Sequence, residues 1–326
     1  MDDESSPHTL PKPFVWRRLH SLTGLFLVLY LFLHLLTNSQ AALFIGDDGE
    51  GFITDVNRIH TLPYLPLIEL FLLGVPFAIH IWSGIYYLLT AEPNSGTSDG
   101  TVPSLPQYGR NHAYTWQRIT SWFLLVAIVA HVVHMRFIKA PKETKLGHQQ
   151  EYLTRLESDP GLYTVATRLG AILLDEKQVD QLRSQLEQEE PSLIALRSKP
   201  SSELSIDERL LLQERSQQEQ FVTVLEAEAL QPGQLVALAD NFAVPTLLML
   251  RETFQSIPYA LLYTLFVLAA SFHSCNGLWT ALISWGVTLN RRIQWLSLCF
   301  CWGAMALLMF MGLASIWATY WINLRS

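Results

Sequence analysis

The sequence predicts an all-α integral membrane protein in which five transmembrane helices form a bundle. Half of the 326 residues are hydrophobic and only 16% are charged, whereas soluble domains usually carry about 25% charged residues. Five long stretches contain almost no charge, and basic residues gather in alternate connections between them. The stretches are residues 19–37, 62–91, 119–135, 253–290 and 293–324.

Each stretch is long enough to cross the apolar core of a bilayer as a helix, which takes about 20 residues. Within lipid, an isolated strand cannot satisfy its backbone hydrogen bonds, and a barrel would show many short alternating segments instead. Glu69 is the only carboxylate inside these stretches. No small-residue motif for signal-peptide cleavage follows the first stretch. We therefore expect this stretch to be retained as a membrane helix rather than removed.

The composition excludes other classes of protein. Ten Trp and sixteen Phe residues argue against disorder. Three cysteines, Cys275, Cys299 and Cys301, are too few for a disulfide scaffold in so long a chain. The formal net charge of −7 gives no basic footprint for nucleic acid.

The basic residues also predict an orientation. If the helices alternate, seven of these residues fall on one side of the membrane: Lys12, Arg17, Arg18, Arg110, Arg118, Arg291 and Arg292. The short segments on the other side hold only Arg58, Arg136 and Arg325. The positive-inside rule therefore places the N-terminus in the cytoplasm and the C-terminus outside.

One polar region interrupts the apolar pattern. Residues 139–252 hold 12 basic and 19 acidic residues, a difference of −7, which equals the net charge of the whole chain. Residues 179–186 and 208–225 have helical apolar spacing, with breaks expected at Pro160, Pro191, Pro200 and Pro232. We expect two to four short amphipathic helices on the outer face. The predicted organisation is membrane helices in 1–138 and 253–326, separated by this largely helical insertion.

Four histidines lie at two depths when each is measured from the outer end of its own helix. His34 is 4 residues before Asn38 and His131 is 5 before Arg136, whereas His80 is 17 past Pro63 and His273 is 15 past Pro258. The two levels differ by about 15–18 Å at the rise of a helix. Two pairs of imidazoles on four helices are what two stacked bis-histidine haems require, and such ligation suits electron transfer.

Other interpretations of the histidines stay open. A single histidine in a membrane helix can be a packing partner that hydrogen-bonds a neighbouring helix. A zinc or copper site would favour a closer cluster with Cys or carboxylate help, and the three cysteines form no such spacing. His134 lies three residues after His131 and could replace it as ligand; we prefer His131 because it sits deeper.

At this point the sequence resembles a known family, the five-helix, two-haem cytochrome b subunits of succinate dehydrogenases and fumarate reductases with a single anchor subunit. The matching segments are Arg17-Arg18-Leu19-His20-Ser21-Leu22, His34, Glu69 with His80 eleven positions later, His131, His273-Ser274-Cys275-Asn276-Gly277-Leu278-Trp279-Thr280 and Ser284-Trp285-Gly286. The resemblance covers about residues 14–138 and 240–323. The insertion departs from the family pattern.

The resemblance implies two haem b groups, an inner one held by His80 and His273 and an outer one held by His34 and His131. It also implies a flavoprotein with covalent FAD and an iron–sulfur subunit on the cytoplasmic side of a bacterial inner membrane, with a quinone, usually menaquinone, as membrane substrate. This chain would carry electrons in respiratory complex II and would have no dicarboxylate catalytic site.

Further residues are candidates for roles around the haems. Glu69, about 16 Å further out than His80, could move protons for quinone chemistry, or it could be an interfacial carboxylate. Arg17, Arg18 and His20 could bind haem propionates or the iron–sulfur subunit, or could only anchor the helix. Three glycines could let a macrocycle approach a helix backbone, or could serve plain helix packing: Gly24, Gly84 and Gly277.

Two alternative functions remain. The chain could be the cytochrome b subunit of a hydrogenase or formate dehydrogenase, although those should lack the Asn-Gly-Leu-Trp run. It could instead be a non-redox transporter or scaffold whose histidines relay protons or pack helices. Inverted repeats or broken helices would favour a transporter, and Pro76 could kink the second helix.

Overall fold

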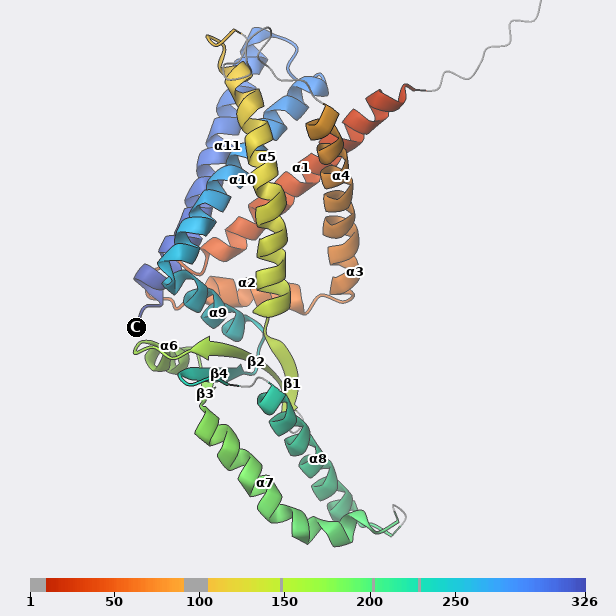
Figure 1. Cartoon of the computed structure of the whole chain (residues 1–326), viewed down its shortest axis with the longest axis vertical. Coiled ribbons are helices and arrows are strands. Elements are labelled where there is room, and N and C mark those ends of the chain that lie inside the picture. The colour runs from red at the N-terminus through yellow and green to blue at the C-terminus, as the bar shows by residue number, and fades with distance from the viewer. Residues whose placement is uncertain (1–9, 91–104, 147–148, 201–202, 228–229) are drawn as a thin grey trace, which may run out of the picture. The chain divides into compact units, whose positions relative to one another are not determined.

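A computed structural model describes residues 10–90, 105–146, 149–200, 203–227 and 230–326. Among these residues, five helical segments are long and apolar enough to cross a membrane (Figure 1). They are Lys12–Ser39, Leu65–Thr90, Gly109–Ile138, Ile257–Ser284 and Arg291–Trp317. The five predicted membrane helices are therefore confirmed. Residue 91, which ends the second predicted stretch, lies outside the described residues.

Two of these helices begin well before their uncharged stretches. Helix α1 (Lys12–Ser39) starts at Lys12 rather than at residue 19, and α5 (Gly109–Val132) starts at Gly109 rather than at residue 119. Backbone hydrogen bonds hold a helix together whether or not its side chains are apolar. The charge pattern therefore located the membrane-spanning part of each helix and missed its polar extension.

The second segment is not one regular helix. It consists of α3 (Leu65–Glu69), a wider π-helical turn η1 (Leu70–Gly74) and α4 (Val75–Thr90). Pro76 lies at the start of α4; its ring has no N–H and crowds the carbonyl of the preceding turn. The π turn just before this proline widens the helix, and it thereby accommodates both the missing N–H and the crowded carbonyl.

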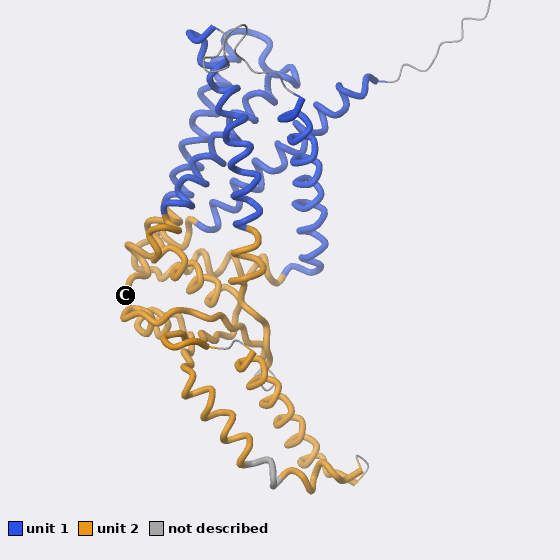
Figure 2. The backbone as a smooth tube through the Cα atoms, viewed as in Figure 1, with its two compact units in different colours: residues 1–38, 62–131, 261–313 blue, residues 39–61, 132–260, 314–326 orange. Residues whose placement is uncertain are grey.

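The chain divides into two compact units, which Figure 2 shows in different colours. Unit 1 consists of residues 1–38, 62–131 and 261–313, and unit 2 of residues 39–61, 132–260 and 314–326. Unit 1 contains most of α1, α4, α5, α10 (Ile257–Ser284) and α11 (Arg291–Trp317).

Helices α1, α10 and α11 meet in the core of unit 1. Leu35, Cys275, Leu308 and Met311 form one buried cluster there. A Cβ atom added to Gly312 of α11 would lie 2.5 Å from a methyl carbon of Val267, so this close helix contact requires glycine. Small residues of this kind let membrane helices pack closely.

Unit 2 contains an antiparallel four-stranded sheet that the sequence did not predict. The strands are β1 (Lys142–Leu146), β2 (Gln149–Glu157), β3 (Ile172–Leu174) and β4 (Gln234–Ala239), in the order β1-β2-β4-β3. In the β2–β4 pair, Tyr152 lies opposite Ala239 and Glu157 opposite Gln234. Residues 139–252 thus contain the expected helices together with a sheet that was not expected.

The remaining elements of unit 2 are helical. They are α2 (Glu50–His60), η2 (Val133–Ile138), α6 (Leu162–Arg168), α7 (Glu176–Arg197), α8 (Ile206–Ala227), α9 (Ala243–Gln255) and η3 (Thr319–Asn323). The predicted helical spacing of residues 179–186 and 208–225 is confirmed in α7 and α8. The expected break at Pro191 is wrong, because α7 continues through it. Ion pairs between the two helices, Arg183 with Glu226 and Arg197 with Glu219, support α7 there.

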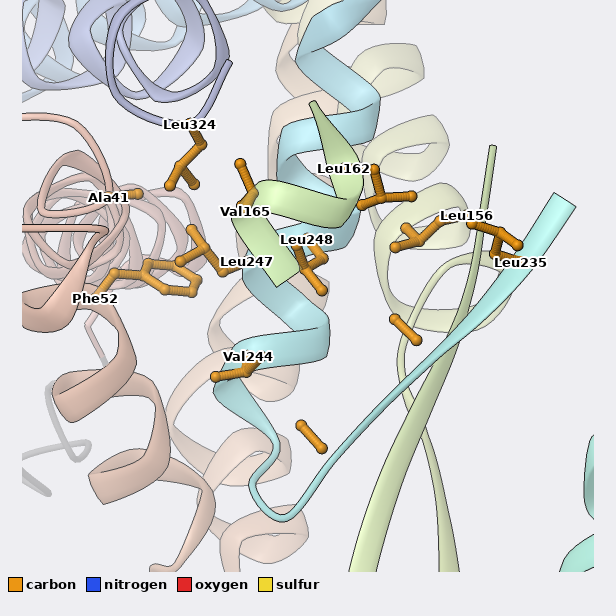
Figure 3. Close-up of a cluster of buried hydrophobic side chains, with 12 residues drawn as sticks. Ala41, Phe52, Leu156, Leu162, Val165, Leu235, Val244, Leu247, Leu248 and Leu324 are labelled. Atoms are coloured by element: carbon orange, nitrogen blue, oxygen red, sulfur yellow. The ribbon is translucent and has the colours of Figure 1, made fainter. Parts of the chain in front are cut away.

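Helices cover both faces of the sheet. On one face, Leu156 and Leu235 of the strands pack with Phe52 of α2, Leu162 of α6 and Leu247 of α9 (Figure 3). On the other face, a second buried cluster joins the strands to α7 and α8 through Leu153, Val179, Phe221, Val222, Leu225, Val236 and Leu238. Successive side chains along β2 and β4 point to opposite faces of the sheet, so the same two strands contribute to both buried clusters.

A buried arginine ties α9 to the last residues of the chain. Arg251 is 1% exposed and donates two hydrogen bonds to Asp159, at 2.6 and 2.7 Å. It also donates to the carbonyls of Leu324 (2.6 Å) and Arg325 (3.1 Å). Partial burial alone would raise the pKa of the Asp159 carboxyl, but the bonds from Arg251 and from the nearby backbone hold that pKa below its ordinary value.

We expect Arg251→Ala to destabilise unit 2 by about 3–5 kcal/mol, the range for removing one partner of a buried ion pair. The substitution removes the guanidinium that pairs with the Asp159 carboxylate and that donates to the carbonyls of Leu324 and Arg325. Amide hydrogen exchange in α9 and η3 measures this loss as faster local opening.

Arg168→Ala is the matched control, because the Arg168–Asp48 pair (3.0 Å) is partly exposed on both sides and such pairs contribute about 0–1 kcal/mol. The folded-state pKa of Asp159 is lowered, so its contribution is present at neutral pH and disappears as the pH falls through that pKa. Equal exchange in Arg251→Ala and in the unsubstituted chain would contradict this account.

Candidate functional site

The four predicted ligand histidines come together in two pairs within unit 1. His34 of α1 faces His131 of α5, with ring centroids 6.0 Å apart and ring planes at 81°. His80 of α4 faces His273 of α10, with centroids 6.4 Å apart and planes again at 81°. Each pair therefore joins two different helices, as the depth argument requires.

These separations fit an iron atom between two imidazoles. A bond from metal to imidazole nitrogen is about 2 Å, and each nitrogen lies roughly 1 Å from its ring centre, which together predict centroids about 6 Å apart. Both pairs have this spacing. The residues present therefore fit two bis-histidine haem groups.

The hydrogen bonds of His80 decide which of its nitrogens is available as a ligand. Its Nδ1 lies 3.2 Å from the carbonyl oxygen of His20. Because a carbonyl can only accept, Nδ1 carries the proton and donates it. Nε2 then keeps its lone pair, which is the state that a metal-bound imidazole needs.

His273 is oriented in the same way by two hydroxyls of α5. Its Nδ1 lies 3.4 Å from Ser121 Oγ and 3.5 Å from Thr120 Oγ1. Those hydroxyls already donate to the carbonyls of Gln117 (2.6 Å) and Trp116 (2.8 Å). Their free lone pairs therefore accept the proton of His273 Nδ1, and Nε2 again remains available.

In the outer pair, one of the two histidines has a hydroxyl group beside its Nδ1 atom. Nδ1 of His131 lies 3.2 Å from the Tyr263 hydroxyl, and the ring of His34 stacks beside Tyr30 at 5.6 Å. His134 is placed differently: its ring stacks on Tyr259 at 5.2 Å, and its Nδ1 has no hydrogen-bond partner among the described residues. His131 rather than His134 therefore lies opposite His34.

The residues that bond the Nδ1 atoms were not predicted from the sequence. Thr120, Ser121 and Tyr263 lie inside uncharged stretches, where Ser and Thr are ordinary helix-packing residues. The spacing of Ser and Thr along a helix could indicate that they lie on a packed face. It does not show which histidine they contact, because that depends on how each helix is rotated about its axis.

His20 lies against the inner pair rather than at the surface of the bundle. Its ring stacks on His80 with centroids 4.1 Å apart and planes at 13°. Its Nδ1 is 2.7 Å from Ser83 Oγ, which itself donates to the carbonyl of Ile79 at 2.7 Å. The structure therefore brings His20 directly onto His80, one of the predicted ligands.

The two predicted arginines differ. Arg18 donates to the carbonyl of Ser284 at the end of α10 and lies over the rings of Phe14 and Trp285. A cation at this place stabilises a helix C-terminus. Arg17 takes no part in these contacts and is exposed.

Two of the three predicted glycines face histidine rings. A Cβ atom on Gly24 would lie 3.0 Å from Cε1 of His80, and one on Gly84 would lie 3.6 Å from Cε1 of His20. Gly277 instead faces Gln117, with 3.8 Å to Nε2. Gln117 donates to the His273 carbonyl at 3.2 Å and accepts from Asn276 at 2.8 Å, so it links α5 to the ligand-bearing turn of α10.

Glu69 and the cysteines complete the predicted set. Glu69 is the last residue of α3, directly before the π turn, and is partly buried. Cys275, Cys299 and Cys301 are free thiols. Among the residues that the structure describes, no three His, Cys, Asp or Glu side chains are grouped so as to hold a metal ion by themselves.

Comparison with known proteins identifies one relative. No protein-family model matches the chain, and no solved structure matches it. Over 126 residues the chain is 31% identical to a protein of Bacillus subtilis (strain 168) named succinate dehydrogenase cytochrome b558 subunit. The match covers 38% of this chain and 56% of the relative, so the chain spans about half the length of that relative.

The similarity agrees with the five apolar helices, which make the chain a multi-pass membrane protein. Together these findings support the resemblance: over part of its length, the chain is similar to a succinate dehydrogenase cytochrome b558 subunit.

Proposed function

We propose that this chain is the di-haem membrane anchor of a succinate:quinone oxidoreductase. His80 and His273 hold the inner haem b, and His34 and His131 hold the outer one. The observation that carries the proposal is the spacing of the two pairs, with ring centroids 6.4 and 6.0 Å apart on four helices. When bound, each haem supplies a one-electron redox centre whose two axial positions are filled, which suits electron transfer.

The chain's own residues hold and orient these ligands. The His20 carbonyl and the hydroxyls of Thr120 and Ser121 accept the Nδ1 protons of the inner pair. This fixes the tautomer and the ring orientation, and it raises the basicity of Nε2. The apolar helices around the pairs keep water away, and a low dielectric environment helps to set the redox potential.

The proposed orientation assigns a side of the membrane to each proposed partner. The basic residues that begin α1, α5 and α11 support a cytoplasmic location for that end of unit 1. An iron–sulfur subunit, with a flavoprotein that carries covalent FAD, would dock there in the inner membrane of a bacterium. A membrane quinone, menaquinone in the first instance, would react near the outer haem. Residues 139–252 would then lie on the outer side.

Glu69 is the proposed proton-transfer group for the quinone. It is the only carboxylate in the five uncharged stretches and lies about 16 Å further out than His80. It also stands directly before the π turn η1, and turns of this type are frequent at functional sites.

Substitution of single ligands tests the haem assignment. We expect His273→Leu to remove one component of the reduced-minus-oxidised haem b spectrum and His34→Leu to remove the other, because each change deletes one axial ligand. His134→Leu is the control, and it should keep both components since its ring stacks on Tyr259. If His273→Leu retained both haems, the proposed ligand pairs would be wrong.

The glycine beside His80 gives a second test of the inner pair. Gly24→Val places a branched side chain where even a Cβ would be 3.0 Å from the His80 ring, so we expect the inner haem component to be lost or strongly reduced. Gly303→Val on α11 is the control, because a Cβ there meets nothing within 4 Å. Equal haem content in the two variants would rule out a close approach of α1 to His80.

The role of Glu69 is tested by Glu69→Gln in the whole complex. We expect the rate of quinone reduction to fall about 10²–10⁴-fold, the usual contribution of a general acid or base. Both haem components should remain, because Glu69 ligates neither. Glu50→Gln, at the exposed start of α2, is the control and should react at the unsubstituted rate. An unchanged rate in Glu69→Gln would refute the assignment.

A further inference from the structure

Helices α5 and α10, which lie side by side in unit 1 (Figure 1), enclose a small pocket. Its volume is about 360 Å³, near the lower end of the range for ligand pockets, about 300–1,000 Å³. The pocket is lined by Trp116, Thr120, Leu268, Ala269 and Phe272. Both helices are long and apolar enough to cross a membrane, so the pocket lies at the depth of the bilayer.

The surface of this pocket suits hydrocarbon. It is almost entirely apolar, and the hydroxyl of Thr120 is already engaged, since it donates to the Trp116 carbonyl at 2.8 Å and lies 3.5 Å from Nδ1 of His273. Thr120 is buried, whereas Trp116 and Leu268 are 56% and 37% exposed, so the pocket opens on the outside of the bundle. An apolar cavity stays free of water. The ligand that this surface favours is therefore a lipid chain.

A cation lies further along the same face of α10. Trp279 follows Phe272 by seven residues, which is about two helical turns and about 10 Å toward the C-terminal end of α10. The guanidinium carbon of Arg110 lies 5.4 Å from the centroid of the Trp279 ring, and Arg110 is exposed. Arginine suits phosphate groups, and basic residues between membrane helices bind anionic lipid headgroups. The site thus combines an apolar pocket with a cation about two turns away.

We propose that this pocket binds one acyl chain of an anionic phospholipid whose phosphate lies at Arg110. The proposal goes beyond the proposed function and does not depend on bound haem. A phospholipid has both features that the site requires, a negative charge for Arg110 and a hydrocarbon chain for the pocket. A quinone has a neutral headgroup, and its proposed site is near the outer histidine pair. The bound chain covers Thr120, the hydroxyl that lies beside Nδ1 of His273.

The test uses the full-length chain in nanodiscs of phosphatidylcholine with phosphatidylglycerol that carries a photoactivatable diazirine in one acyl chain. Mass spectrometry of peptides then locates the cross-links. We expect labelling near Trp116, Leu268 and Phe272 to exceed that near Phe300 and Trp302, which are exposed on α11. Replacing phosphatidylcholine by unlabelled phosphatidylglycerol, at a constant amount of probe, should lower the labelling of the pocket and leave that of α11 unchanged. Equal labelling of the two faces, or no competition, would indicate ordinary boundary lipid and overturn the proposal.

Two pairs of variants separate the acyl chain from the headgroup. Ala269→Leu fills the pocket and should abolish the excess labelling, whereas Ala306→Leu, at an exposed position of α11, should keep it. Arg110→Gln should lower labelling of the pocket by the anionic probe, whereas Arg292→Gln, exposed at the start of α11, should not. Should Ala269→Leu fail to fold, the competition in the unsubstituted chain decides the question.

A third probe identifies the source of the chain. If a menaquinone with a diazirine in its isoprenoid tail labels the pocket and the phospholipid probe does not, the proposed occupant is wrong. Failure of the proposed function would appear elsewhere, as a chain without haem, and would leave the lipid labelling unchanged.

Discussion

Hydrogen bonds donated by the Nδ1 atoms of His80 and His273 are the interactions on which the proposed site depends. A neutral imidazole can present either nitrogen, and the partner of one nitrogen decides which remains available. At His80 that partner is a backbone carbonyl, and at His273 it is a pair of hydroxyls whose own protons are already donated to α5. In both residues Nε2 therefore keeps its lone pair, which is what the proposed haem ligation requires.

In both units, several buried or partly buried polar side chains donate to backbone carbonyls. In unit 1, the short side chains of Ser83, Thr120 and Ser121 return their protons to carbonyls of their own helices and leave lone pairs for histidine. In unit 2, Arg251 is almost fully buried and donates to Asp159 and to two carbonyls near the C-terminus.

The sequence predicted those features of the structure that depend on a single property, such as hydropathy or the constant rise of a helix. Length and absence of charge locate the five membrane helices, because lipid allows few other solutions. The depth of each histidine along its helix predicted that His34 would meet His131 and that His80 would meet His273, since helical rise is constant. The sheet of unit 2 was missed because β2 pairs with β4, more than 70 residues later, and short strands give a weak local pattern. The hydroxyl partners and the position of His20 depend on how each helix is rotated, which hydropathy does not encode.

The haem content of the purified, unsubstituted chain tests the central claim most directly. A haem extraction assay together with a reduced-minus-oxidised absorption spectrum should give two haem b groups per polypeptide, in two spectral components. A carefully prepared, folded sample that contains no haem would contradict the account, because the paired imidazoles would then have another purpose.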